Sequence, residues 1–545
     1  MKFNKPVGRV IFAVILGLIS SVAHGDWLSE LEHLPVQDAG RIKPFDTFAK
    51  EATQLVYGKR KFNNSSSAEV VFTWMVTPEL WSSAPIVEVR HSGVKEALNL
   101  EKTQRYFSMN ELMTNPKLPL IFGELQNRRE RQEKLNPYFQ AVQRIENQLG
   151  LLQVLARGEA PGFAPPAEGS TWLTLKHLPP ELQEKFVILA KSFLAAIGDK
   201  GTAEGKAKLE TELKDFKAAV TAHGQGIAPD ILTKVSWEVH YNEFHPFLWS
   251  WVSYLLGLLF MVAYMVRGHA WQNNGGWVFI FIGFLLHTYG MALRIYLAGR
   301  PPVSNMYETV VWVPWGVVLF GFILERIQKS KLVLISAAAI ATFCLILTDL
   351  APAVLDPSLH PLEPVLRSTF WLTTHVLIIT ISYAAFFLAF ALGDLLLFYF
   401  LKDEEKYAKQ IHIGAQSIYR CLQIGVVLLA AGIILGGIWA DYSWGRFWGW
   451  DPKETWALIA LLGYLAVLHA RLTGWVRSFG MAVTSVLGFS LVIMAWYGVN
   501  FVLGAGLHSY GFGAGGVEYV TGFVVLHILY VTYVTTVRYG RKKRA

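Results

Sequence analysis

Long apolar segments separated by short polar ones fill the second half of the chain. A helix needs roughly 20 apolar residues to cross a bilayer, and these segments have about that length. They predict membrane-spanning helices at Pro246–Val266, Gly276–Ala298, Thr309–Leu324, Leu332–Leu350, Phe370–Leu401, Cys421–Ala440, Trp456–Ala470, Met481–Leu503 and Val517–Val537. We therefore expect an all-α polytopic membrane protein with about nine transmembrane helices.

A shorter apolar run opens the chain and has the features of an export signal. Lys2, Lys5 and Arg9 precede the apolar stretch Val10–Ile19, and Ser21-Val22-Ala23 supplies small residues for cleavage. This order is typical of a secretory signal peptide. We predict a signal peptide at residues 1–23, with an uncleaved N-terminal anchor as the alternative. Either one sends the next segment out of the cytoplasm.

Residues 24–245 have the length of a soluble domain. Charged stretches near Gln126–Leu155 and Pro180–Ala222 predict helices, and the Pro/Gly/Ala-rich stretch Glu159–Ser170 between them predicts a linker. The sequence of this region holds no nucleophile–base set, phosphate loop or metal cluster. We expect a largely helical exported, periplasmic domain.

Basic residues gather in alternate loops. With the N-terminal domain outside, the inside segments are 267–275, 325–331, 402–420, 471–480 and the tail 538–545. The outside loops between spans hold only Arg300, Arg367, Arg446 and Lys453. Basic loops stay on the cytoplasmic side. The pattern predicts a multi-pass protein of the bacterial inner membrane with a cytoplasmic C-terminus.

Composition agrees with the membrane assignment and argues against nucleic-acid binding and dithiol exchange by this chain. Hydrophobic residues make up 53% and charged residues 17% of the chain. The net charge of +8 follows from the basic inner loops, so it requires no nucleic-acid partner. Cys344 and Cys421 stand alone in separate apolar segments, without a CxxC motif. Any thiol chemistry must therefore come from partner proteins of a thiol-reducing pathway.

The polar segment Trp439–Trp456 is unusually aromatic, with five Trp, one Tyr and one Phe. Amphipathic rings are common at a membrane interface, but this density exceeds what one helix end needs. It predicts a flat apolar platform for a flat apolar ligand. Arg446 and Lys453 are placed to meet acidic groups at the edge of such a ligand.

Two histidines lie on the same predicted membrane face as this loop. His375 is one turn into a span that starts at the outer face, and His508 lies in the outer loop Gly504–Gly513. A metal between two imidazoles, against Trp faces, is a haem-like arrangement. Each His alone is better explained as a helix cap or interfacial hydrogen-bonding group, but two such residues near one Trp-rich loop favour haem.

Three further histidines lie within spans. His469 is near the inner end of the seventh span, where an ionisable residue is costly and suggests a function. One His cannot ligate both faces of a haem, so its partner must come from another helix or another chain. His287 and His527 are internal candidates, and both also fit a packing role.

Several of these segments together resemble a known family. The run Trp444-Gly-Arg-Phe-Trp-Gly-Trp-Asp-Pro-Lys-Glu454 resembles the WWD-domain signature of haem-handling proteins in cytochrome c-type biogenesis. Accompanying segments similar to the CcsA (ResC) branch are Pro302–Glu308, Thr374-His375, His469-Ala-Arg471 and Gly506–Ser509. The segment Pro35–Asp46 resembles the exported region of fused CcsB–CcsA proteins. The resemblance covers residues 230–540.

The resemblance implies a role in System II cytochrome c maturation, with 246–537 as the haem-handling domain. Family members work with CcsB (ResB) in haem transport to the outer face, and they present haem to the CxxCH motif of apocytochrome c for thioether attachment. It implies non-covalently bound haem b, His375 and His508 as outer iron ligands and His469 as one inner ligand. The implied haem platform is Trp444, Arg446, Trp448, Trp450 and Asp451.

The resemblance also implies a partner. No CcsB-like group of spans precedes the exported domain in this sequence, unlike the fused form. We therefore expect the second inner ligand on a separate CcsB/ResB-like membrane protein, with His287 in second place. No residue is an obvious acid or base for thioether formation. Asp451 and Glu454 are candidates only. The chain is expected to be the synthase, haem lyase-like component of a CcsB–CcsA complex, acting by positioning.

Other functions remain open from the residues alone. The chain fits a transporter or flippase that uses the Trp-rich loop as a gate, or a membrane glycan enzyme that stacks sugars on its Trp rings. A haem lyase of the other bacterial maturation pathway is a further alternative. The large exported domain and the number of spans argue against that last function.

Overall fold

The structure of the chain is a computed structural model. It describes residues 26–62, 65–133, 135–197, 202–351, 354–361, 368–503 and 516–544. The chain separates into two compact units, Met1–Asn242 and Glu243–Ala545. The predicted signal peptide or anchor at residues 1–23 lies outside the described residues.

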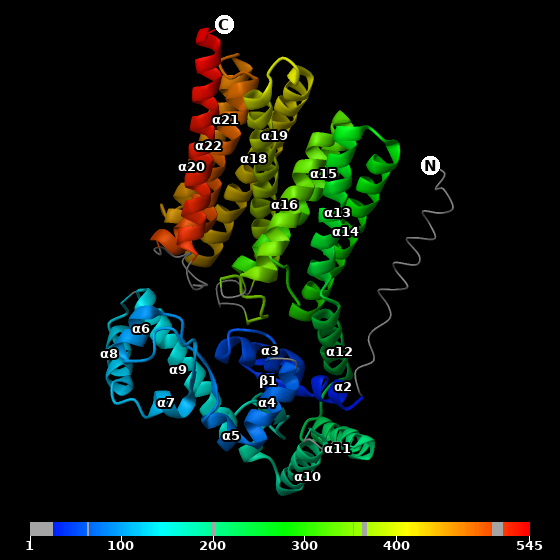
Figure 1. Ribbon diagram of the computed structural model, residues 1–545, viewed down its shortest axis with the longest axis vertical. Coiled ribbons are helices and arrows are strands. Elements are labelled where there is room, and N and C mark those ends of the chain that lie inside the picture. Colours follow the sequence, from blue (N-terminus) through cyan, green and yellow to red (C-terminus); the bar gives the residue numbers. More distant parts are fainter. Residues whose placement is uncertain are drawn as a thin grey trace. The chain divides into compact units, whose positions relative to one another are not determined.

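The first unit combines short helices with two small antiparallel sheets (Figure 1). Its helices are α2 (Asp26–Glu32), α3 (Phe45–Val56), α4 (Ser67–Val76), α5 (Pro78–Ser82), α6 (Ser92–Ala97), α7 (Met109–Met113), α8 (Leu118–Glu130), α9 (Pro137–Ala156), η1 (Leu175–His177), α10 (Pro180–Ile197), α11 (Ala203–Ala222) and α12 (Pro229–Phe244). Strands β2 (Arg41–Pro44), β1 (Pro35–Asp38), β5 (Gly162–Ala164) and β6 (Leu173–Thr174) form one sheet in that order, and β3 (Pro85–Glu88) pairs with β4 (Tyr106–Ser108).

Polar caps and buried rings hold this unit together. Ser66, Asn136 and Thr202 each accept a hydrogen bond from the backbone N–H three residues further on, which satisfies a donor left open at a helix N-terminus. The rings of Phe72 and Phe193 meet edge to face at 4.6 Å inside the core. The unit is mainly helical, as expected, but it also contains strands, and the predicted linker Glu159–Ser170 includes the buried strand β5. The strands have only two to four residues, too few for a clear alternating pattern.

Nine helices among the described residues are long and apolar enough to cross a membrane, which confirms the predicted polytopic architecture. These helices belong to the second unit, except for the N-terminal part of the first helix, which belongs to the first unit. Within the second unit one helix follows another along the chain (Figure 1). The elements are α13 (Pro246–Arg267), α14 (Ala270–Ala298), α15 (Met306–Gln328), α16 (Lys331–Leu350), α17 (Thr369–Trp371), η3 (Leu372–Val376), α18 (Leu377–Lys402), α19 (Ala408–Trp444), α20 (Pro452–Leu472), α21 (Ser478–Ile493), η4 (Met494–Leu503) and α22 (Val517–Arg544).

Close helix pairs build the second unit. α13 packs against α14, α15 against α16, and α18 against both α19 and α21. A Cβ at Gly257 of α13 would lie 2.9 Å from the backbone nitrogen of Ile280 in α14. Small residues allow two helix backbones to approach this closely. Such close packing stabilises helix pairs in a membrane, where moving apolar side chains from lipid to protein contributes little.

The sixth span differs most from its predicted bounds. We expected a helix at Cys421–Ala440, but α19 runs from Ala408 to Trp444. Most of the predicted inner loop 402–420 is therefore helical, and the non-helical part of the Trp-rich segment shrinks to Gly445–Asp451. Apolar length marks only the part of a helix inside hydrocarbon, so it misses polar turns that continue beyond it.

Candidate functional site

One pocket in the second unit is lined by parts of the chain that are far apart in sequence. Its walls come from the segment that leads into α15, from η3 and the start of α18, from the end of α19, from the loop into α20, and from η4. The space empty of protein atoms in and in front of the pocket is about 1250 Å³, a figure that includes open solvent. Its lining combines apolar and aromatic side chains with a few polar groups, as is typical of ligand sites.

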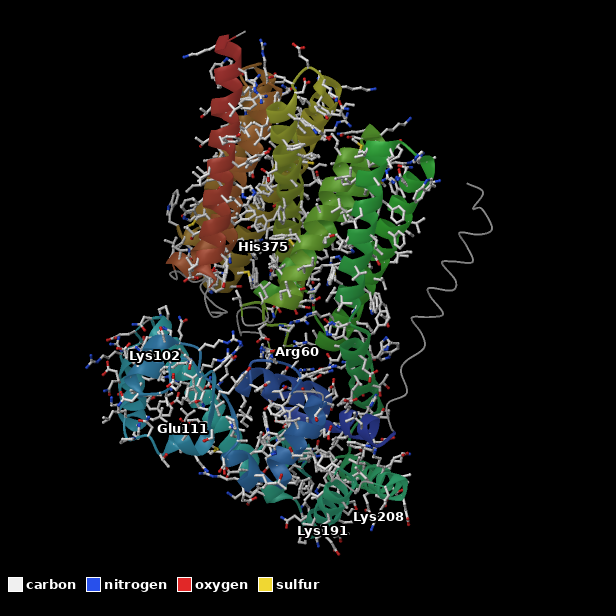
Figure 2. All side chains as sticks on the ribbon, in the orientation of Figure 1. Arg60, Lys102, Glu111, Lys191, Lys208 and His375 are labelled. Atoms are coloured by element: carbon white, nitrogen blue, oxygen red, sulfur yellow. The ribbon has the colours of Figure 1, made fainter. Side chains whose placement is uncertain are left out.

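His375 reaches the pocket from η3, just before α18 begins (Figure 2). Its Nδ1 lies 2.8 Å from the carbonyl oxygen of Gly432 in α19. Because a carbonyl only accepts, Nδ1 must donate, and the neutral ring then keeps its lone pair on Nε2. Metal-binding histidines are oriented in this way, with the other ring N–H on a carbonyl or carboxylate.

Two π-helical segments contribute to this pocket. One is η3, which carries His375, and the other is η4, which contributes Trp496, Asn500 and Phe501. π-Helical turns are rare in proteins, and those that occur are often found at functional sites. Both interruptions of regular α-helix therefore lie where the chain lines a cavity.

Aromatic rings form much of the wall around His375. Trp439 meets the imidazole edge to face at 5.7 Å, and Phe447 and Trp448 line the pocket beside it. Glycine makes room for the imidazole, since a Cβ at Gly436 would lie 2.6 Å from His375 Cε1. The result is an aromatic cavity with one oriented imidazole.

The first turn of α20 holds the Trp-rich loop. Asp451 is the helix N-cap, and its carboxylate accepts a hydrogen bond of 2.9 Å from the backbone N–H of Lys453. Glu454 accepts from the backbone N–H groups of Asp451 at 3.2 Å and Gly449 at 2.8 Å. This capping box satisfies the open donors of the helix start. Asp451, which is 5% exposed, is therefore a structural brace of the loop.

Only part of the predicted platform faces the pocket. The Arg446 guanidinium lies 5.9 Å from the ring centre of Trp444, and its Nη1 lies 3.6 Å from Glu454 Oε1. Trp450 is 70% exposed and has a positive φ of 55°. Trp448 lines the pocket, whereas Trp444, Arg446, Trp450 and Asp451 lie outside its described lining.

Residues 303–508 match the protein family described as "Cytochrome C assembly protein". The cytochrome c biogenesis protein CcsA of Synechococcus sp. (strain CC9605) is 34% identical over 272 residues, which cover 44% of this chain and 88% of that protein. The chain belongs to the CcsA family. CcsA of Prochlorococcus marinus (strain NATL1A) is 37% identical over 268 residues, or 42% of this chain and 82% of that protein.

Similarity also extends beyond the length of these CcsA proteins. Protein NrfI of Wolinella succinogenes is 30% identical over 503 residues, which cover 87% of this chain. The chain spans about half of NrfI, 53% of its length. As a CcsA-family protein, the chain is a multi-pass membrane protein of cytochrome c biogenesis, in a family that handles haem. Family membership favours this function over a transporter of another amphiphile or a glycan enzyme.

The predicted histidines fall in different settings. His375, His469 and His508 lie within the family match, and His508 lies outside the described residues. His469 is exposed, with Nδ1 2.7 Å from the carbonyl oxygen of Leu465 in its own helix. The pocket therefore brings together the Trp-rich loop and His375, and it does not include His469.

His287 is fully buried in α14. Its Nε2 lies 3.0 Å from the carbonyl oxygen of Val311, and its Nδ1 lies 3.3 Å from Tyr254 Oη. His527 pairs with Asp394 across α22 and α18, with Nε2 3.2 Å from Oδ2. Both side chains thus have protein partners for their ring nitrogens, as a packing role requires.

Several pocket residues were not singled out from the sequence. These are Trp496, Asn500 and Phe501, which line the wall from η4. Val303–Met306, which line it before α15, lie within the segment Pro302–Glu308 that resembled the CcsA branch. The aromatic residues at the end of the eighth span were the available signal, since they share the character of the Trp-rich loop. Nothing in the spacing indicates that this span end bends toward His375.

Proposed function

We propose that the pocket binds haem as cargo, with His375 as one axial ligand to the iron. The observation that carries this proposal is the imidazole, which Gly432 orients through Nδ1 and which aromatic rings surround in the pocket. Imidazole is a usual haem ligand, and haem faces are apolar. The haem would be haem b, bound without a covalent link.

The second outer ligand in this proposal is His508. It follows η4, whose Trp496, Asn500 and Phe501 already line the pocket. Trp448 would contact the haem face, while Trp444, Arg446, Trp450 and Asp451 would keep the loop in shape. Two axial imidazoles would saturate the iron and limit stray oxygen chemistry.

The chain would act by positioning. The pocket would hold haem at the outer face while the CxxCH segment of an apocytochrome c approaches, and its two thiols would add to the two vinyl groups. Holding reacting groups in place contributes several kcal/mol by the general proximity effect. Haem and thiols supply the reactive groups, so this chain would be the synthase component of a complex.

An inner haem site is the second part of the proposal. His469 would supply one ligand, and a CcsB/ResB-like membrane protein would supply the other. The exposed position of His469 supports a partner on another chain. His287 is the internal alternative, although reaching a haem would require it to leave its bonds to Val311 and Tyr254.

The test is the absorption spectrum of the detergent-purified protein, with and without the CcsB-like partner and with haem supplied. We expect a six-coordinate, bis-imidazole spectrum that is lost or shifted in His375→Ala and His508→Ala. A second haem should appear only with the partner and should disappear in His469→Ala. His527→Ala is the matched histidine control and should keep the spectrum. No haem in wild type under any of these conditions would refute the proposal.

A further inference from the structure

Two cations of the Trp-rich segment differ in what surrounds them. Arg446 faces Glu454 and lies over Trp444, outside the described pocket lining. Lys453, two residues into α20, lines the pocket. The sequence alone offered both as contacts for an acidic ligand, and the structure separates them.

The ammonium group of Lys453 is held by a neutral side chain. Its Nζ donates to Asn500 Oδ1 at 3.3 Å, a partly buried bond that links α20 to η4. Among the residues that the structure describes, no carboxylate lies within ion-pair distance of this nitrogen. The two acidic residues near it in the chain bind backbone groups instead. Asp451 accepts from the backbone N–H of Lys453, and Glu454, which also lines the pocket, accepts from the backbone N–H groups of Gly449 and Asp451.

The position of Lys453 is unfavourable for a cation in two ways. It lies in the first turn of α20, where the helix dipole is positive and acidic residues are favoured. It is also half-buried among the aromatic residues of the pocket, which disfavours an unpaired charge. Capping by Asp451 and Glu454 already stabilises the start of this helix, so the helix does not need a lysine here. An anionic ligand in the pocket would remove both penalties.

We propose that Lys453 and Asn500 form the carboxylate-binding end of the pocket. In the haem complex, on which this inference rests, the ammonium group would bind a propionate. Propionates and vinyl groups occupy different edges of the porphyrin, so anchoring a propionate also selects which edge is presented to the apocytochrome. Lys453 would thus set the orientation of haem while His375 holds the iron.

The test compares ferric haem with its dimethyl ester, in which both propionates are neutral. Binding to the full-length protein is measured by absorption titration for wild type, Lys453→Met, Lys453→Arg and the exposed control Lys409→Met. A charge-assisted hydrogen bond is worth roughly 1.5–3 kcal/mol, so wild type should prefer haem over the ester by about tenfold or more. Lys453→Met should lose this preference, and Lys453→Arg and Lys409→Met should keep it.

The iron spectrum distinguishes loss of the anchor from loss of the site. Lys453→Met should bind the ester as wild type does, with the same axial-ligand spectrum. Retention of the full preference for haem in Lys453→Met would overturn the role of Lys453. If wild type binds neither compound, the haem proposal itself fails, and if wild type binds both equally, only the carboxylate anchor fails.

Discussion

At the scale of single residues, the pocket depends on positions where a side chain is missing. Gly436 lies one turn beyond Gly432, the residue whose carbonyl orients His375. The imidazole occupies the space that a Cβ at Gly436 would need, at 2.6 Å from Cε1. The next residue, Gly437, gives room to Phe447 in the same way, since a Cβ there would lie 2.6 Å from its ring. These glycines let an imidazole and an aromatic ring approach the backbone of α19.

Substitution of Gly436 by Ala should therefore weaken haem binding by moving His375. Overpacking a dense site costs roughly 1–3 kcal/mol, so we expect the Kd for haem to rise about tenfold or more. The control is Gly522→Ala in α22, where a Cβ would have open space. Absorption titration of both variants checks this. Wild-type affinity and spectrum in Gly436→Ala would mean that this orientation of His375 is not the one that binds iron.

At the scale of elements, a buried ion pair fixes the wall that precedes α15. Arg294 of α14 and Glu308 of α15 are each 1% exposed, with Nε 2.9 Å from Oε1. The other oxygen of Glu308 accepts from the backbone N–H and the hydroxyl of Ser304, a pocket residue. Arg294 also donates to the carbonyl of Pro357. One ion pair thus ties two loops to two helices.

Glu308→Gln should destabilise the second unit strongly, because it leaves a buried guanidinium without its counter-charge. Breaking one side of a buried pair costs about 3–5 kcal/mol. The matched control is Glu404→Gln, whose carboxylate is 39% exposed and pairs with Arg538, and such a pair contributes about 1 kcal/mol or less. Thermal unfolding in detergent should show a much larger drop in Tm for Glu308→Gln. Equal Tm values would contradict the structural role of this pair.

At the scale of the whole molecule, helix count and loop charge together predict orientation. Nine crossings would put the two ends of the membrane unit on opposite sides. Basic residues gather in the loops that share a side with the C-terminus, which is the cytoplasmic side by the usual charge bias. We propose that the N-terminal unit and the Trp-rich loop are periplasmic, in the inner membrane of a bacterium.

Cysteine labelling in intact cells tests this orientation. The native Cys344 and Cys421 are buried and should not react. Tyr442 is 80% exposed beside the Trp-rich loop, and Trp475 is 86% exposed between α20 and α21. A membrane-impermeant thiol reagent should label Tyr442→Cys in intact cells and Trp475→Cys only after permeabilisation. The reverse pattern would invert the topology.

Helix length and type could be predicted from the sequence because a bilayer imposes a physical length. Apolar segments such as Leu332–Leu350 match α16 closely for this reason. The polar ends of α19 could not be predicted from apolar length, because that length marks only the part of a helix that suits hydrocarbon. The short strands of the first unit depend on pairing between distant segments, as β1 with β5 shows.

The sequence by itself determined the membrane class, the order of spans and the residue types that suit haem, since hydrophobicity, charge and motif spacing are local properties. Tertiary structure decided which of these residues share one cavity. It placed Trp448, Lys453 and His375 together, brought η4 to the same wall and left Arg446 beside Glu454. These contacts depend on how helices pack and where π-helical turns redirect side chains, and neither property is contained in any single segment.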